Sequence, residues 1–159
     1  MVRLTTDNFN ERTMFNKILI AIDGSSYSKK ALEFACDLAN QYDAYLTILH
    51  VAYNPAQSHT MVLGSSAVTY QDNQKELNEM AEVIIDAARQ IATKADCKDV
   101  VTRIQKGIPA EQILEYAGEN NTDLIVLGSR GLSDVAGFFQ GSVSHKVNHL
   151  CKCTCITVR

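Results

Sequence analysis

The apolar residues of this chain fall into short continuous runs separated by longer amphipathic segments. Three runs, Lys17 to Ile22, Ala44 to Val51 and Leu124 to Leu127, are typical of strands buried on both faces of a parallel sheet. Asp99 to Gln105 alternates apolar and polar residues, which suits a strand at the edge of a sheet. A fifth strand is expected near Cys153 to Val158.

Each pair of successive strands is separated by a segment with helical spacing. A helix after the first run has Ser25, Ser26 and Ser28 as candidate caps, and Pro109 suits the first turn of another. The apolar positions that we expect to face the core are Ala31, Ala35, Leu38 and Tyr42; Leu77, Met80, Ala81, Ile84, Ile85, Ala88, Ile91, Ala92 and Ala95; Ala110, Ile113, Leu114 and Ala117; and Val143, Val147 and Leu150.

Strands therefore alternate with helices along the chain, beginning and ending on a strand. Such alternation predicts an α/β domain with one doubly wound, open parallel five-stranded sheet and helices on both faces. In these sheets ligands bind at the carboxyl ends of the strands, where the strand order reverses. The order itself does not follow from the pattern.

Two segments have no period. Residues 1–14 are polar, and we expect a flexible N-terminal tail before a domain over residues 15–159. Asn54 to Asn73 contains Pro55, Gly64 and several serines, and is expected to be a long loop. A long loop near a site is often a lid, so this segment is the candidate for movement on ligand binding.

Composition limits the classes of function. The chain has 159 residues and a formal net charge of −3, which gives no electrostatic argument for nucleic acid or an anionic membrane. No apolar run has the length of a membrane span, and the amino terminus lacks the apolar core of a signal peptide, so we expect a cytoplasmic protein. Five cysteines, an odd number, favour reduced thiols over a disulfide framework.

The segment from Asp123 to Lys146 contains the strongest candidate chemistry. Four of the eight glycines lie in the fourteen residues from Gly128 to Gly141, which suggests a backbone that glycine adopts most easily. A glycine-rich link from a strand into a helix is a good anion site, because free N–H groups and the positive end of the helix converge there. Ser142, Ser144 and Arg130 add further donors, so phosphate is the expected ligand.

The spacing of the glycines distinguishes this loop from other phosphate loops. Neither a Gly-Lys-Ser/Thr sequence nor a G-x-G-x-x-G fingerprint is present. Gly128-x-x-Gly131, nine further residues and Gly141-Ser142 together resemble the motif of the ATP-binding branch of the universal stress protein family. The resemblance extends from about Phe15 to Arg159.

The resemblance implies the adenine nucleotide alpha hydrolase-like strand order 3-2-1-4-5, with the site between the first and fourth strands. It also implies ATP as the ligand, with ADP and AMP left open. Three glycines would bind phosphate and ribose, Ser142 to Ser144 match the phosphate-contacting turn, Asp23 lines the adenosine end, and three apolar residues surround the base. The candidate residues are Ala21, Ile22, Asp23, Leu46, Leu127, Gly128, Arg130, Gly131, Gly141, Ser142, Val143 and Ser144.

Several of these residues also have a purely structural interpretation. Ser142 and Ser144 are either phosphate donors or helix caps, and the resemblance favours the ligand role. Arg130 either neutralises phosphate or is a solvated loop charge. Asp23 either closes its turn or lines the site, where it could help to hold Mg²⁺ against the phosphates.

Metal and catalytic sites have weaker support. His145 and His149 are four residues apart near Cys151, Cys153 and Cys155, but the histidines are expected on the solvated face and the cysteines lack C-x-x-C spacing. We therefore expect core or interface thiols. His50 is interpreted as structural, and no nucleophile elbow or paired base predicts a catalytic residue.

The resemblance implies a nucleotide-linked regulator of the stress response. The family usually forms homodimers through the last strand, here near Thr154 to Arg159, although Thr154 stands where many relatives have proline. A slow ATPase, or a dimeric interaction module with structural nucleotide, remains an alternative. The expected partners are an adenine nucleotide, a second copy and unknown proteins, with no nucleic acid and no membrane.

Overall fold

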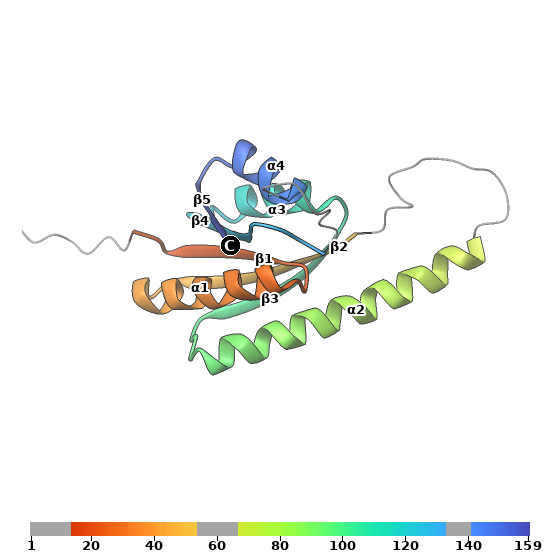
Figure 1. The fold of residues 1–159 in the computed structure, drawn as a ribbon, viewed down its shortest axis with the longest axis horizontal. Coiled ribbons are helices and arrows are strands. Elements are labelled where there is room, and N and C mark those ends of the chain that lie inside the picture. The colour runs from red at the N-terminus through yellow and green to blue at the C-terminus, as the bar shows by residue number, and fades with distance from the viewer. Residues whose placement is uncertain (1–13, 54–66, 133–140) are drawn as a thin grey trace, which may run out of the picture.

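The computed structural model describes residues 14–53, 67–132 and 141–159. Five strands alternate with four helices in these residues (Figure 1). In chain order the elements are β1 (Lys17–Ile22), α1 (Ser26–Tyr42), β2 (Tyr45–Ala52), α2 (Ala67–Lys94), β3 (Val100–Lys106), α3 (Pro109–Glu119), β4 (Leu124–Gly128), α4 (Ser142–Leu150) and β5 (Thr154–Val158).

The strands form one parallel sheet with the order β3-β2-β1-β4-β5. This confirms the predicted fold class and the strand order that the resemblance implied. The chain moves outward from β1 to β3 and then returns to β4 on the other side of β1, so the order reverses between β1 and β4.

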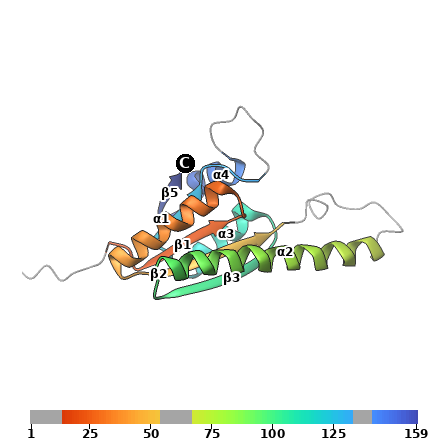
Figure 2. The ribbon, with the colours of Figure 1, turned by 60° about the horizontal axis from the view of Figure 1, so that its bottom comes forward.

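Helices cover both faces of the sheet. Figures 1 and 2 show α1 and α2 on one face and α3 and α4 on the other. Alternate residues of β1 divide between the two cores: Ile18, Ile20 and Ile22 pack in the cluster with α1 and α2, while Leu19 packs with α3 and α4. Because the central strands are buried on both faces, their sequences are continuous apolar runs.

Local signals explain where two helices begin. Ser25 caps α1, since its hydroxyl accepts a hydrogen bond from the Ser28 N–H at 3.1 Å. Pro109 is the first residue of α3, where a missing N–H removes no helical bond.

Three features of the helices differ from the sequence prediction. α2 begins at Ala67, so the predicted loop from Asn54 to Asn73 is wrong over its last seven residues, and the remainder lies outside the described residues. Leu150, predicted to be buried, is 51% exposed, whereas Ser144 is buried with Val147. In α2, Met80 was also expected to face the core but is 61% exposed.

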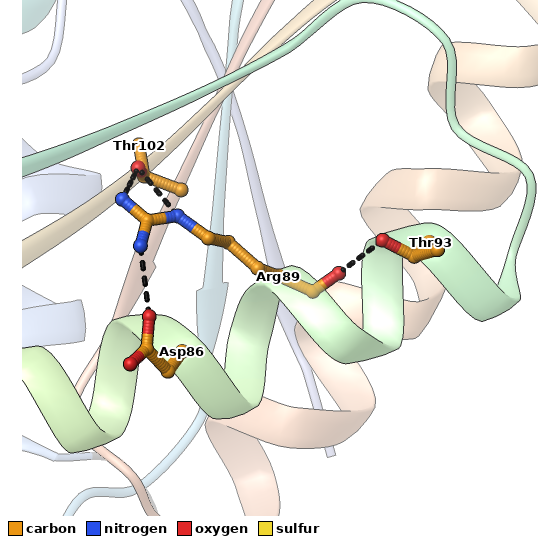
Figure 3. A network of polar contacts seen from close by, with 4 residues as sticks. All are labelled: Asp86, Arg89, Thr93 and Thr102. Carbon is orange, nitrogen blue, oxygen red and sulfur yellow. Dashed lines mark hydrogen bonds and ion pairs between the residues drawn. The ribbon is translucent and has the colours of Figure 1, made fainter.

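A polar contact fixes α2 to the edge strand β3 (Figure 3). The Arg89 guanidinium donates to Thr102 Oγ1 from Nε at 3.2 Å and from Nη2 at 2.7 Å, and pairs with Asp86 at 2.8 Å. Thr93 donates to the Arg89 carbonyl one turn later. Because Asp86 and Arg89 both belong to α2, only the bonds to Thr102 in this network join the helix to β3.

Within the described residues, none of the helices is both long and apolar enough to cross a membrane.

Candidate functional site

The reversal point lies at the carboxyl ends of β1 and β4. Ala21 is paired with Leu127 in the register of the two strands, and Asp23 and Ser129 follow directly after them. The segment after each strand leads toward a helix, α1 in one case and α4 in the other. The predicted residues at these two strand ends are thus brought together.

Asp23 connects the two segments. Its Oδ1 accepts a hydrogen bond from the Ser25 N–H at 3.0 Å, and its Oδ2 accepts one from the Leu132 N–H at 3.0 Å. A Cβ atom at Gly131 would lie 2.6 Å from Oδ2. The carboxylate can therefore hold the glycine segment in this position because residue 131 has no side chain.

Gly128 is required for a different close approach. A Cβ atom there would lie 2.8 Å from the Tyr27 carbonyl carbon and 2.9 Å from the Ser28 nitrogen, both in the backbone of α1. Among the described glycines only Gly24 and Gly107 have positive φ, so the expectation of an unusual backbone is wrong at Gly128, Gly131 and Gly141. Glycine is required at positions 128 and 131 because a Cβ atom would collide with neighbouring atoms, and not because the backbone has a positive φ.

The amino end of α4 differs from that of α1. Gly141 is the N-cap of α4, and it offers no side-chain acceptor to the N–H groups of the first turn, whereas Ser25 caps α1. Uncapped N–H groups at a helix amino end carry the positive end of the helix dipole and bind anions. Ser142 at this end is exposed, so its hydroxyl faces solvent.

Ser144 has partners inside the protein. Its residue is 4% exposed, and its Oγ lies 3.2 Å from the Ser129 carbonyl and 3.0 Å from the Gly141 carbonyl. Ser129 O also accepts the Gly141 N–H at 2.8 Å. In this structure the Ser144 hydroxyl therefore joins the start of α4 to the end of β4. Val143 beside it is half-buried in the core that α3 and α4 share.

Arg130 lies next to the α1 segment. Its guanidinium carbon is 6.0 Å from the centre of the Tyr27 ring, and Lys30 Nζ lies at the same distance from that ring. Ser25 Oγ lies 3.5 Å from the Arg130 carbonyl. Two positive side chains are thus placed around one aromatic ring close to the glycine segment.

Leu46 is the predicted residue that the structure does not bring to this edge. It pairs with Ile18 at the amino end of β1 and is buried in the core under α1 and α2. Its expected place beside the base is therefore corrected: the carboxyl end of β2 begins four residues later, where Ile22 pairs with His50.

His50, Val51 and Ala52 are the β2 residues that reach the carboxyl edge. His50 is buried and its Nδ1 lies 2.9 Å from the Ile22 carbonyl, which fits the structural role expected for it. The sequence analysis did not single out Val51 and Ala52, which lie at this carboxyl edge. The rule that ligands bind at strand carboxyl ends would have favoured them over Leu46.

The other candidate ligands do not form a metal centre in the part of the chain that the structure describes. No group of three or more histidine, cysteine, aspartate or glutamate side chains there has the arrangement of a metal site. All five cysteines are free thiols. Cys151, Cys153 and Cys155 pack against the core under α3 and α4.

A family model and a curated relative both match nearly the whole of this chain and point to the same family. The profile described as "Universal stress protein family" matches residues 14–159. Universal stress protein YxiE of Bacillus subtilis (strain 168) is 39% identical over 148 residues, which cover 92% of this chain and 100% of that protein.

Solved structures agree with this match. Universal stress protein UspA from Lactobacillus plantarum has a TM-score of 0.79 at 26% identity, covering 91% of this chain and 98% of that one. A universal stress protein in complex with cAMP has a TM-score of 0.66 at 25% identity, covering 91% and 97%. On the profile and the relatives together, the chain belongs to the universal stress protein family.

Proposed function

We propose that this protein binds an adenine nucleotide, ATP with Mg²⁺ in the first instance, at the carboxyl ends of β1 and β4. The uncapped amino end of α4 carries this proposal. In the described residues it is a helix start where N–H groups, the helix dipole and an exposed hydroxyl converge beside a glycine segment held by a carboxylate.

The two ends of the nucleotide would lie at different elements. The phosphates are assigned to Gly131, Gly141 and the first turn of α4, with Arg130 as a neighbouring positive charge. The adenosine end is assigned to the strand ends, which comprise Ala21, Ile22, Asp23, Leu127 and Gly128, with Val51 taking the place predicted for Leu46.

Among the residues that the structure describes, Asp23 is the candidate protein ligand for Mg²⁺ at this edge. Asp23 uses each oxygen for one backbone bond, which leaves lone pairs for a metal that is shared with phosphate oxygens. Magnesium would supply charge neutralisation of the phosphates, and Asp23 itself keeps the glycine segment and α1 together.

The relative in complex with cAMP supports an adenine nucleotide as the ligand class. A nucleotide-linked regulator of the stress response is the function that fits this site and the family, acting in the cytoplasm as a homodimer. Dimer formation is assigned to β5, which is an edge strand of the sheet.

A slow ATPase and an interaction module with structural nucleotide are the rival functions. Among the described residues, Asp23 is the acidic side chain bonded to the glycine segment, and both of its oxygens accept backbone hydrogen bonds. We therefore expect single-turnover assays with ATP to detect no hydrolysis faster than that in buffer. Release of phosphate at a faster rate would favour the ATPase.

The location of the site is tested by an NMR titration with ATP and Mg²⁺. The amide signals of Gly131, Leu132 and Ser142 should shift in a saturable way. Signals of Ile18 and Leu46 at the opposite end of the strands should not. Saturable shifts confined to the Ile18 end, or no shifts, would contradict the proposal.

A further inference from the structure

Two thiols from distant parts of the sequence meet beneath α1. Cys36 lies in α1, and Cys97 lies in the turn between α2 and β3, 61 residues later. The Cys97 thiol donates a hydrogen bond to the Cys36 carbonyl oxygen, with 3.9 Å between Cys97 Sγ and that oxygen. Both cysteines pack in the core under α1 and α2.

The turn that carries Cys97 is fixed against α1. Asn40 of α1 donates a hydrogen bond to the Ala95 carbonyl at 2.7 Å, and the Cys97 N–H is bonded to the Ala92 carbonyl at 3.0 Å. Asp96, between Ala95 and Cys97, adopts a left-handed conformation with φ of 53°. These bonds hold the two cysteines beside each other in the folded protein.

The two thiols differ in access to solvent. Cys97 lines a cavity of about 270 Å³ at the amino end of the sheet, together with Asn40, Asp43 and Lys98. Cys36 is 0% exposed and lies behind it. A small reagent can therefore reach the Cys97 sulfur first.

The pKa values of the two thiols also make Cys97 the more reactive one, in agreement with its greater access to solvent. Burial, with a smaller contribution from the neighbouring Cys97, raises the pKa of Cys36 to about 12. Burial also raises the pKa of Cys97, but the neighbouring Cys36 side chain acts in the opposite direction. Cys97 is therefore the thiol that ionises more easily, and Cys36 stays protonated.

We propose that Cys97 and Cys36 form an oxidisable dithiol site, in which hydrogen peroxide entering through the cavity converts the pair to a disulfide. The Cys97 thiolate attacks a peroxide oxygen; an S–O bond forms, the O–O bond breaks, and the released hydroxide takes a proton to become water. Cys36 then attacks the Cys97 sulfur; the S–S bond forms, the S–O bond breaks, and the second oxygen leaves as water with the Cys36 proton.

In total, two electrons pass from the two thiols to one hydrogen peroxide, and two waters are formed. The reaction does not involve the proposed nucleotide site. The disulfide would join α1 to the turn after α2, closing a long segment of the chain. Long closed segments restrict the unfolded state strongly, so oxidation should stabilise the fold.

The test is peptide mapping of the reduced full chain after exposure to hydrogen peroxide, blocking with N-ethylmaleimide and trypsin digestion without reductant. We expect a disulfide between the short peptide 95–98 and the peptide that contains Cys36, reversed by dithiothreitol. The thermal midpoint should rise by on the order of 5–10 °C.

A control variant removes competing thiols. Cys151→Ser combined with Cys153→Ser and Cys155→Ser leaves only Cys36 and Cys97, and it should still form the bond. Cys97→Ser should not, and Cys36→Ala should leave Cys97 oxidised but unlinked. Absence of the linked peptide in both the native chain and the triple variant, or its formation only after the circular dichroism of the fold is lost, would overturn the proposal.

Discussion

At the scale of the residue, glycines of this chain differ in what a methyl group would meet. A Cβ at Gly128 would collide with the backbone of α1, whereas a Cβ at Gly118 in α3 has no atom within 4 Å. Gly141 accepts a Cβ at ordinary contact distances, 3.4 Å from Arg130 Cα. The motif therefore contains glycines with unequal structural requirements.

Gly128→Ala should lower the free energy of unfolding by about 1–3 kcal/mol or more, because neither Tyr27 nor Ser28 can move its backbone without shifting α1. Gly118→Ala is the matched control, and should raise stability by up to about 1 kcal/mol, since alanine favours a helix. Urea unfolding measures both. Equal effects of the two substitutions would contradict the close packing at Gly128.

The buried thiol of Cys36 predicts a dependence of stability on alkaline pH. Burial raises its pKa from 9.0 to about 12, so the unfolded chain releases this proton at lower pH than the folded one. The stabilisation of the fold by this protonated thiol is fully present below about pH 9 and is lost as the pH rises toward about 12.

Urea unfolding of the reduced protein across this pH range measures how steeply the free energy of unfolding falls with pH. Cys36→Ala should be less stable at neutral pH but should lose less stability as the pH rises. An identical slope in the two proteins would contradict the burial of the thiol in the fold.

At the scale of the element, β5 has one paired and one open side. The Thr154 N–H donates to the Asp123 carbonyl at 3.2 Å, and the Val158 carbonyl accepts from Ser129 at 2.7 Å. Residues of a parallel strand alternate in the neighbour to which they bond, so the backbone groups of Cys155 and Thr157 face the open edge. Thr157 Oγ1 is buried and has no hydrogen-bond partner among the described residues.

Thr157→Pro therefore tests the proposed homodimer. Proline removes an N–H that faces the open edge without removing a bond to β4, so the monomer should fold while pairing of two β5 strands is blocked. Thr157→Val keeps the N–H and should remain dimeric. Sedimentation analysis distinguishes these states, and a dimer of unchanged strength in Thr157→Pro would exclude β5 pairing.

The elements also show what the sequence could and could not predict. Buried strands such as β1 and β4 are visible as apolar runs because both of their faces are covered. The amino-terminal part of α2 extends beyond the sheet (Figure 1). An extended helical segment of this kind needs no continuous buried stripe, and the sequence from Ala67 to Asn73 has no clear period.

At the scale of the whole molecule, the fold class followed from the alternation of strands and helices, and the strand order from the family resemblance. The resemblance also selected the carboxyl edge of β1 and β4. It misplaced Leu46, which lies near the amino end of the predicted strand from Ala44 to Val51 and not at the carboxyl end, where ligands bind. The contact between Cys36 and Cys97 could not be predicted locally, since it joins segments that meet only in the folded chain.

The central claim is that the amino end of α4 binds the phosphates of an adenine nucleotide. The most direct measurement is calorimetric titration of ATP with Mg²⁺ into the native chain, Ser142→Asp and Asn148→Asp. Both variants add one negative charge to exposed positions of the same helix, and only Ser142 lies at its amino end.

The account predicts that the native chain and Asn148→Asp bind ATP with similar affinity. Ser142→Asp should bind about tenfold more weakly or worse, a loss of about 1.4 kcal/mol or more. Its thermal midpoint should not fall, because aspartate stabilises a helix amino end. Equal binding by the two variants, or no binding by the folded native chain, would contradict the account.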